Sequence, residues 1–274
     1  LWPMKPALLT VEDLHLSFPL ARGRRIRPLD GLSFHLARGE ILGIAGESGC
    51  GKSTLARALM GFYRPERGHI RIDGQERSGL KGKDLLHWQR KMQMVFQDPL
   101  TSLDPRQTIG DALMEPMDIH GLHAHREARR QQCRSLLQAV GLPASALERL
   151  PRQFSGGQLQ RIGIARALSL EPEILIADEA VSALDVSIQA QIINLFRELR
   201  ERMGLSIIFI SHDLAVLRTL CDRMAVMQAG QFVEMRSTEE LCRDPQHPYT
   251  RQLIAAIPRL RQRRQPSSPS TSHP

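Results

Sequence analysis

The amino-acid sequence predicts an α/β fold with a mainly parallel sheet, an antiparallel β subdomain and an inserted helical subdomain. Apolar runs of strand length at residues 41–45, 174–178 and 205–210 alternate with segments of helical periodicity, the pattern of strands joined by crossover helices. Residues 8–18 instead alternate apolar and polar side chains, as a strand with one solvated face does. Residues 108–150 have helical spacing and no strand-like run, so we expect them to form a separate helical unit.

From the N-terminus to Pro99 the chain has mostly the pattern of strands and turns. The Arg-rich stretch before Pro28 predicts a hairpin loop. One helical segment begins near Thr54 and ends before Pro65, which cannot continue a helix. The strands expected in this part of the chain are residues 8–18, 31–36, 40–45, 69–72 and 91–96.

After Pro99 the composition shifts toward Arg, Gln, His and Ala, and we expect a helical subdomain over residues 98–165. An apolar i, i+4, i+7, i+11 spacing over residues 188–199 predicts a helix that packs one face on the sheet. Residues 223–234 predict a hairpin. The Ser- and Pro-rich tail from Gln265 predicts disorder.

Composition limits the class of protein. The 274 residues are 42% hydrophobic and 24% charged, and no apolar run approaches the roughly 18 residues that span a bilayer. The four cysteines are scattered without a Cys-x-x-Cys pair, so neither a disulfide framework nor a zinc site is indicated, and we expect a reducing, cytoplasmic compartment.

The net charge of +8 permits a nucleic acid or an anionic membrane as partner. Aromatic residues are only 4% and do not cluster beside the basic runs, so no nucleic-acid partner is expected.

A glycine-rich loop between a predicted strand and a predicted helix organises the chain. In this context glycines let the backbone curl with its N–H groups inward, and the helix N-terminus favours an anion. Lys52 is expected to reach the β- and γ-phosphates of ATP, and the Ser53 hydroxyl to bind Mg²⁺. The residues of this predicted ATP site are Gly46, Glu47, Ser48, Gly49, Cys50, Gly51, Lys52, Ser53 and Thr54.

A second element, Ile174-Leu175-Ile176-Ala177-Asp178-Glu179, places two carboxylates at the C-terminal end of a strand. Ligands of such sheets bind at this end. Asp178 is expected to bind Mg²⁺, directly or through water, and Glu179 to polarise the attacking water.

A third element opens a helix with the residues Ser155, Gly156, Gly157 and Gln158. Exposed amides and a hydroxyl at a helix N-terminus form an anion site. The glycine-rich loop already provides one phosphate-binding site. A second such site in the same chain has a role if it faces a nucleotide that is bound to another subunit.

In this order along the chain, the three elements resemble those of the nucleotide-binding subunit of an ABC transporter, over residues of about 8–258. The resemblance implies a head-to-tail dimer that holds two ATP molecules, each between the glycine-rich loop of one subunit (the P-loop, Gly46–Ser53) and the signature, Ser155–Gln158, of the other. It implies that Glu179 and His212 are catalytic and that His212 contacts the γ-phosphate. It also implies Ser53, Gln97 and Asp178 as contacts of Mg²⁺, Gln97 as a link to the membrane subunit, Asp185 in the D-loop Ser182–Asp185, and Phe18 as the aromatic residue under adenine.

The chain departs from the usual family pattern at two positions. Phe154 stands where Leu is commonest, and Ala180 stands where Pro usually follows the glutamate. Neither change removes a functional group, so hydrolysis is still expected.

Four further segments narrow the resemblance to the ATPases of oligopeptide, dipeptide and nickel importers. The chain resembles the second of two different ATPases, which together act with two permeases and, indirectly, an extracytoplasmic binding protein. This implies a heterodimer rather than a homodimer, at the cytoplasmic face of the inner membrane. The segments are Gln93–Pro99, Ser102–Arg106, Ser182–Gln191 and Asp244–Thr250.

Peptides are the first solute that we expect, and nickel or a metal chelate is the alternative. A soluble ABC ATPase acting on nucleic acid or ribosomes is an alternative of another class, but such proteins usually have a long coiled-coil insertion or two ATPase units. The expected organisation is one ATPase domain over residues 8–258, with a C-terminal motif at 237–258, followed by a basic, disordered tail at 259–274. A metal site is not expected at the histidines that surround a glycine in a predicted loop, His120, His123 and His125.

Overall fold

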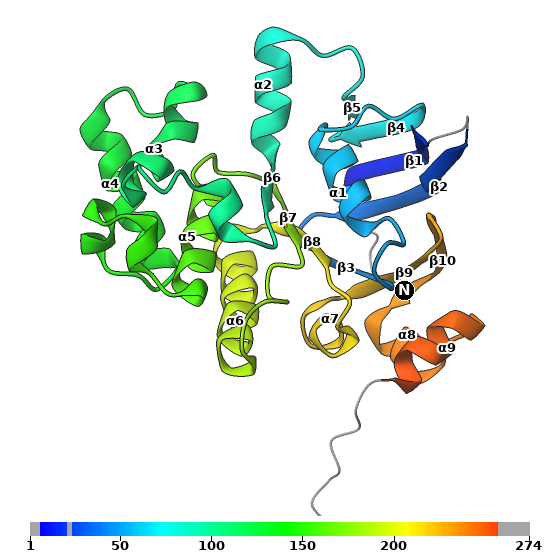
Figure 1. Cartoon of the computed structure of the whole chain (residues 1–274). Coiled ribbons are helices and arrows are strands. Elements are labelled where there is room, and N and C mark those ends of the chain that lie inside the picture. Colours follow the sequence, from blue (N-terminus) through cyan, green and yellow to red (C-terminus); the bar gives the residue numbers. More distant parts are fainter. Residues whose placement is uncertain (1–5, 21–23, 257–274) are drawn as a thin grey trace, which may run out of the picture.

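The computed structural model describes residues 6–20 and 24–256, which form two sheets surrounded by helices (Figure 1). The smaller sheet is antiparallel in the order β2-β1-β4-β5, and the larger has the order β10-β9-β3-β8-β7-β6. In the larger sheet only β9 and β10 pair antiparallel, so it is mainly parallel, as predicted. The strands are β1 (Ala7–Pro19), β2 (Arg25–Ala37), β3 (Ile41–Ala45), β4 (Arg67–Ile72), β5 (Gln75–Glu76), β6 (Met92–Val95), β7 (Ile174–Asp178), β8 (Ser206–Ile210), β9 (Arg223–Gln228) and β10 (Gln231–Ser237).

Figure 1 shows α3 and α4 to one side of the larger sheet, with α5 and α6 between them and its central strands. The helical unit predicted after Pro99 is therefore present, although its bounds, 98–165, stay a prediction and α5 runs beyond them. Among the described residues, none of the helices has the length and apolar content to cross a membrane. The helices are α1 (Lys52–Met60), α2 (Gly82–Lys91), α3 (Ile109–Ile119), α4 (Arg126–Ala139), α5 (Gly156–Leu168), α6 (Val186–Met203), α7 (Leu214–Leu220), α8 (Thr238–Arg243) and α9 (Pro248–Ala255).

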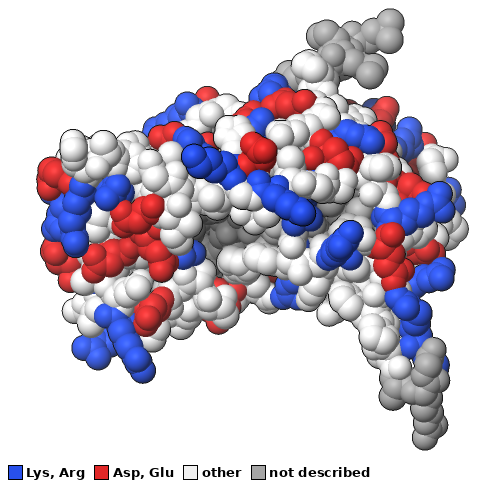
Figure 2. Space-filling view, turned by 90° about the horizontal axis from the view of Figure 1, so that it is seen from above, with Lys and Arg blue, Asp and Glu red and all other residues white. Residues whose placement is uncertain are grey.

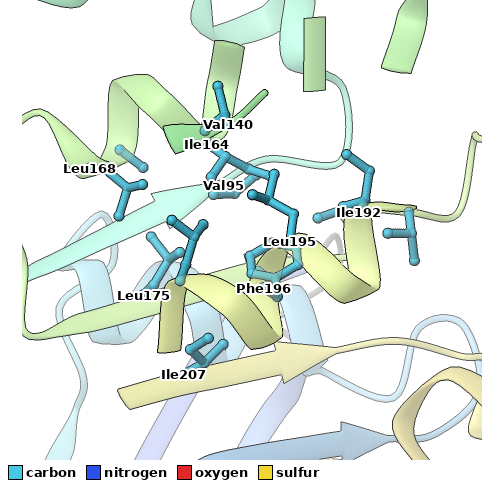
Figure 3. Packing of buried hydrophobic residues seen from close by; sticks show 14 of the residues in the cluster. Val95, Val140, Ile164, Leu168, Leu175, Ile192, Leu195, Phe196 and Ile207 are labelled. Atoms are coloured by element: carbon cyan, nitrogen blue, oxygen red, sulfur yellow. The ribbon is translucent and has the colours of Figure 1, made fainter. Parts of the chain in front are cut away.

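Successive residues of the central strands face two different hydrophobic clusters, because side chains alternate across a sheet. In β8, Ile207 and Phe209 join the cluster that contains the helical unit, whereas Ile208 and Ile210 join the cluster that contains α1 and the smaller sheet. Phe209 packs edge-to-face on Phe196 of α6, with ring centroids 5.3 Å apart. Figure 3 shows the first cluster, with Val95, Val140, Ile164, Leu168, Leu175, Ile192, Leu195, Phe196 and Ile207 labelled.

The C-terminal ends of four neighbouring strands lie at one edge of the larger sheet. The loops that follow β3, β6, β7 and β8 leave the sheet at its C-terminal edge, because these strands run parallel. That edge carries most of the residues for which the sequence predicts a function.

Two details of the sequence-based prediction were wrong. Arg25 and Arg27 lie in β2 rather than in a hairpin loop, since the β1–β2 pairing extends to Pro19 opposite Arg25. Helix α2 was not predicted; most of its residues are polar, and Trp88 is the one that is fully buried. The predicted domain bounds stay a prediction, and the tail at 259–274 lies outside the described residues.

The face seen in Figure 2 carries Lys and Arg interspersed with Asp and Glu, and it is hollowed near its middle. Many charged side chains of the described residues form pairs, such as Arg166 with Glu115 at 3.0 Å and Arg90 with Glu171 at 2.7 Å. On this face, therefore, the net positive charge is not gathered into a single basic patch of the kind that attracts a polyanion.

Candidate functional site

The loop between β3 and α1 has a backbone that requires glycine at two positions. Gly46 has a φ of 154° and Gly51 a φ of 115°, values that residues with a side chain rarely adopt. A Cβ atom on Gly46 would lie 2.3 Å from the carbonyl oxygen of Met227, and one on Gly51 would lie 2.2 Å from that of Pro28. The loop is therefore pressed against the backbone of β9 and β2, which gives it one defined shape.

Lys52 begins α1 and is 96% buried by the loop that precedes it, since only 4% of the residue is exposed. Its Nζ atom donates to the carbonyl oxygens of Gly46 at 2.7 Å and Glu47 at 2.9 Å. The ammonium group thus lies inside the curled loop at the N-terminus of a helix. Both the charge and the helix end favour a bound anion there.

Ser53 and Asp178 bring the first two sequence elements together. Ser53 Oγ donates a 3.0 Å hydrogen bond to Asp178 Oδ1 at the end of β7. Burial raises the pKa of Asp178, against the opposing effect of this hydrogen bond, and the neighbouring charge of Glu179 raises it further. A buried carboxylate beside a hydroxyl is a donor set that suits Mg²⁺, whose charge would offset the cost of burying the carboxylate.

Glu179 has a φ of 50°, which is uncommon for a residue with a side chain and is typical of strained functional turns. The turn is held by the Glu179 N–H, which donates to the carbonyl oxygen of Ile210 at 3.0 Å. It directs the carboxylate toward His212, whose Nδ1 lies 3.4 Å from Glu179 Oε1. A carboxylate beside an imidazole at a strand end can accept a proton from water and orient the reacting groups.

Gln97 follows β6 and is joined to the same turn through Ser182. Gln97 Nε2 donates to Ser182 Oγ at 3.4 Å, and Ser182 Oγ donates to the carbonyl oxygen of Glu179 at 2.9 Å. Asp185 lies three residues further on, where its carboxylate caps α6 by accepting the N–H of Ile188 at 2.9 Å. Ser182, as a link between Gln97 and Glu179, is a contact that sequence reasoning missed.

The signature residues form a capping box at the N-terminus of α5. Ser155 Oγ accepts the N–H of Gln158 at 3.4 Å, and Gln158 Oε1 accepts the N–H of Ser155 at 3.0 Å. A Cβ atom on Gly157 would lie 2.5 Å from Ile188 Cγ2, so the helix end packs closely on α6. Ser155 and Gly156 are exposed, and these signature residues lie beside α6 rather than in the P-loop of their own chain.

Phe18 lies at the end of β1, where its half-buried ring packs edge-to-face on Tyr63 with the ring centroids 5.0 Å apart. Tyr63 was not singled out from the sequence, because only the chain's return after α1 brings it to this strand. The structure thus joins Lys52, Ser53, Asp178, Glu179 and His212 in one site, with Gln97 at its border.

Comparisons with known proteins agree with this geometry. Residues 29–182 match the family model described as ABC transporter, and residues 233–273 match the model described as oligopeptide/dipeptide transporter, C-terminal region. The chain is 46% identical, over an alignment of 274 residues, to the oligopeptide transport ATP-binding protein OppF of Bacillus subtilis, covering 96% of this chain and 90% of that protein. It is 45% identical over 262 residues to OppF of Escherichia coli, covering 93% and 78%.

Solved structures show the same fold. A dimeric ATP-binding cassette, MJ0796, in a post-hydrolysis state bound to ADP and Pi matches with a TM-score of 0.76 and 27% identity, over 84% of this chain and 98% of that one. The cbiO1 subunit of Clostridium perfringens, part of the transporter complex cbiONQ, matches with a TM-score of 0.76 and 25% identity, over 93% and 97%. The α/β core of this chain is thus that of the P-loop NTPases.

Proposed function

Because this chain belongs to the ABC transporter family, as an ATP-binding subunit with the C-terminal region of the oligopeptide and dipeptide transporters, we propose that it hydrolyses ATP to drive the import of peptides. One observation carries the proposal. Lys52, Ser53, Asp178, Glu179 and His212 come together at the ends of the neighbouring strands β3, β7 and β8, in a chain that also has this C-terminal region. The relatives named OppF support peptides, rather than nickel, as the solute.

The residues of the site have complementary roles in the proposed reaction. The P-loop amides and Lys52 would bind the phosphates of ATP, while Ser53 and Asp178 would hold Mg²⁺ directly or through water. When bound, Mg²⁺ supplies positive charge at the β- and γ-phosphates. Glu179 takes a proton from the water whose oxygen bonds to the γ-phosphorus, and the bond from that phosphorus to the β–γ bridging oxygen breaks, which leaves ADP and phosphate. His212 contacts the γ-phosphate and keeps Glu179 oriented.

A second subunit is part of the proposal, since the exposed signature Ser155–Gln158 lies outside the P-loop of its own chain. In a head-to-tail dimer it would meet the γ-phosphate of ATP on the partner, which we expect to be a different ATPase. Val186, next to the D-loop residue Asp185, is 83% exposed and therefore accessible to a partner subunit. ATP would close this dimer because only the closed state bridges both subunits through the γ-phosphate.

Membrane permeases are the other proposed partners, and a groove beside Gln97 suits them. It lies between the larger sheet and the helical unit, and Phe62 at its rim is 59% exposed. The hydrogen bonds from Gln97 through Ser182 to Glu179 lead from this groove to the catalytic turn. A permease helix seated here could therefore sense the state of the nucleotide site. The groove is lined by Met60, Phe62, Gln93, Met94, Val95, Phe96, Pro99, Ser102, Pro116, Gly163, Arg166 and Ala167.

Affinity purification of the tagged chain from gently solubilised membranes tests the proposal. We expect two permeases, a second ATPase and an extracytoplasmic binding protein to copurify, and ligand screening of that binding protein then identifies the solute. Phe62→Asp should remove the permeases from the complex, because it places a charge at the groove. Met203→Asp is the matched control, since Met203 is 43% exposed at the end of α6 and should leave the complex intact. Recovery of only ribosomal or DNA-repair proteins would refute transport and favour the soluble alternative.

A further inference from the structure

The C-terminal motif reaches the P-loop through one tyrosine. Tyr249 Oη accepts a 3.1 Å hydrogen bond from the backbone N–H of Glu47, the second residue of the P-loop, although the two residues are 202 positions apart. The Tyr249 residue is 7% exposed, and its ring is part of the hydrophobic cluster that contains the helical unit. Burial raises the pKa of the Tyr249 hydroxyl, so it keeps its proton near neutral pH. The buried ring therefore holds an uncharged hydroxyl group next to the Glu47 amide.

The peptide unit that Tyr249 contacts is also the one that Lys52 contacts. The carbonyl oxygen of Gly46 accepts from Lys52 Nζ at 2.7 Å, and the N–H of the same peptide unit, which belongs to Glu47, donates to Tyr249. The two partners bind opposite edges of one peptide plane. Rotation of that plane would break both hydrogen bonds and would move the carbonyl oxygen that faces the ammonium group.

The surrounding C-terminal segment holds Tyr249 in place. Glu234 of β10 is 8% exposed and accepts the N–H groups of Gln246 at 2.9 Å and His247 at 3.0 Å. His247 then caps α9, because its Nδ1 accepts the N–H of Tyr249 at 3.2 Å, and Pro248 occupies the first helical position. Helix α8 packs on β9 and β10, and α9 follows it at the C-terminal end of the described chain (Figure 1). The segment Gln246–Tyr249 is thus anchored to the edge of the larger sheet.

We propose that Tyr249 is a positioning residue for ATP binding, which fixes the Gly46–Glu47 peptide unit so that Lys52 and the P-loop amides are already arranged for the phosphates. The proposal rests on the proposed function, in which the P-loop binds ATP. It gives the C-terminal motif a role in nucleotide binding, in addition to any role in contacts with other subunits. A preorganised loop binds its ligand more tightly, because less conformational freedom is lost on binding.

The test compares two variants that each remove one buried hydroxyl. Tyr249→Phe removes only the group that contacts Glu47, and the ring still fills its place. Thr238→Val is the matched control, since Thr238, the first residue of the adjacent α8, is buried and its hydroxyl donates to the carbonyl oxygen of Cys221 at 2.7 Å rather than to the P-loop. ATP·Mg²⁺ binding to the full chain is measured by calorimetry, and backbone amide exchange is measured for the peptide that contains Glu47.

We expect Tyr249→Phe to weaken ATP binding roughly two- to tenfold, the fold-change of one lost hydrogen bond, and to speed exchange of the Glu47 amide. The kcat at saturating ATP should change less than the KM, because the chemistry at Glu179 is untouched. Thr238→Val should leave the ATP affinity and the Glu47 exchange unchanged. Equal ATP affinity in Tyr249→Phe and the unaltered chain, or an equal loss in Thr238→Val, would overturn the positioning role.

A Lys52→Ala variant measured in parallel separates this inference from the proposed function. If Lys52→Ala loses ATP binding while Tyr249→Phe behaves as the unaltered chain, the P-loop assignment stands and the role of Tyr249 is wrong. If the unaltered chain binds no ATP, both are wrong.

Discussion

Ser53 Oγ lies 3.0 Å from Asp178 Oδ1, although 125 residues separate them in the chain. The contact joins the first turn of α1 to the end of β7, across the intervening strand β8. It creates one buried position with a hydroxyl and a carboxylate oxygen, and the carboxylate is held there against the cost of its burial. A Mg²⁺ ion at this position would relieve that cost.

Asp178→Asn should therefore make the nucleotide-free chain more stable while lowering its ATPase activity. The raised pKa means that the folded chain binds a proton at Asp178 more readily than the unfolded chain does, so the ionised carboxylate destabilises the nucleotide-free fold above its ordinary pKa. The variant should melt at a higher temperature at neutral pH without nucleotide, and this difference should shrink as the pH falls through the raised pKa. ATP turnover should fall about 100-fold or more through loss of the metal ligand. Melting curves from pH 4 to 8, with and without ATP·Mg²⁺, check both parts, and a lower melting temperature at neutral pH would contradict the account.

Lys52→Ala should weaken ATP binding itself. The Lys52 ammonium is enclosed by the loop and donates to two of its carbonyl oxygens, so it is placed to form charge-assisted hydrogen bonds with phosphates. Loss of such bonds is expected to raise the Kd for ATP about 10- to 100-fold. Calorimetric titration measures this, and Lys91→Ala, which removes a lysine paired with Asp73 and Glu173, is the control that should bind ATP normally.

Ser155→Asp and Ser155→Asn test whether the signature faces a phosphate. Both residues are good N-caps, so each should keep α5 about as stable as Ser155 does, whereas Ser155→Ala should cost about 1 kcal/mol. Only Asp adds a negative charge at the exposed helix end, where it would repel the γ-phosphate of the partner's ATP. In the assembled complex, Ser155→Asp should lose most ATP turnover while Ser155→Asn keeps more of it. Equal turnover in the two variants would argue against a phosphate at this position.

The P-loop, the Asp178–Glu179 pair and the signature could be predicted because their chemistry lies in contiguous residues whose strand–loop–helix context is visible in the pattern. His212, which follows a buried strand, was singled out only through the family resemblance. The contact of Tyr249 with Glu47 could not, because it depends on the path of the chain after β10, where the segment is anchored by Glu234. The geometry of Gln97 with Ser182 likewise arises from the order of strands in the sheet and not from spacing along the chain.

Helix α2 and the Arg-rich end of β2 were not predicted correctly from the local sequence pattern. Most residues of α2 are polar and only Trp88 is fully buried, so no long apolar run marks this helix in the sequence. A strand pair that carries exposed arginines near its end resembles a loop in composition. In both cases tertiary packing and backbone pairing determine the structure, and neither can be inferred from residues that are close in sequence.

The most direct test of the central claim is ATP turnover by Glu179→Gln in the complex with the proposed partner ATPase. Glu179 lies 3.4 Å from His212 in a strained turn after β7 and is the base of the proposed hydrolysis. Gln keeps the size of the side chain but cannot accept the proton from water, so turnover should fall about 10²- to 10⁴-fold. ATP binding should persist, and the ATP-bound dimer should accumulate and be isolable by size-exclusion chromatography. Unchanged turnover would remove Glu179 from its role and contradict the account.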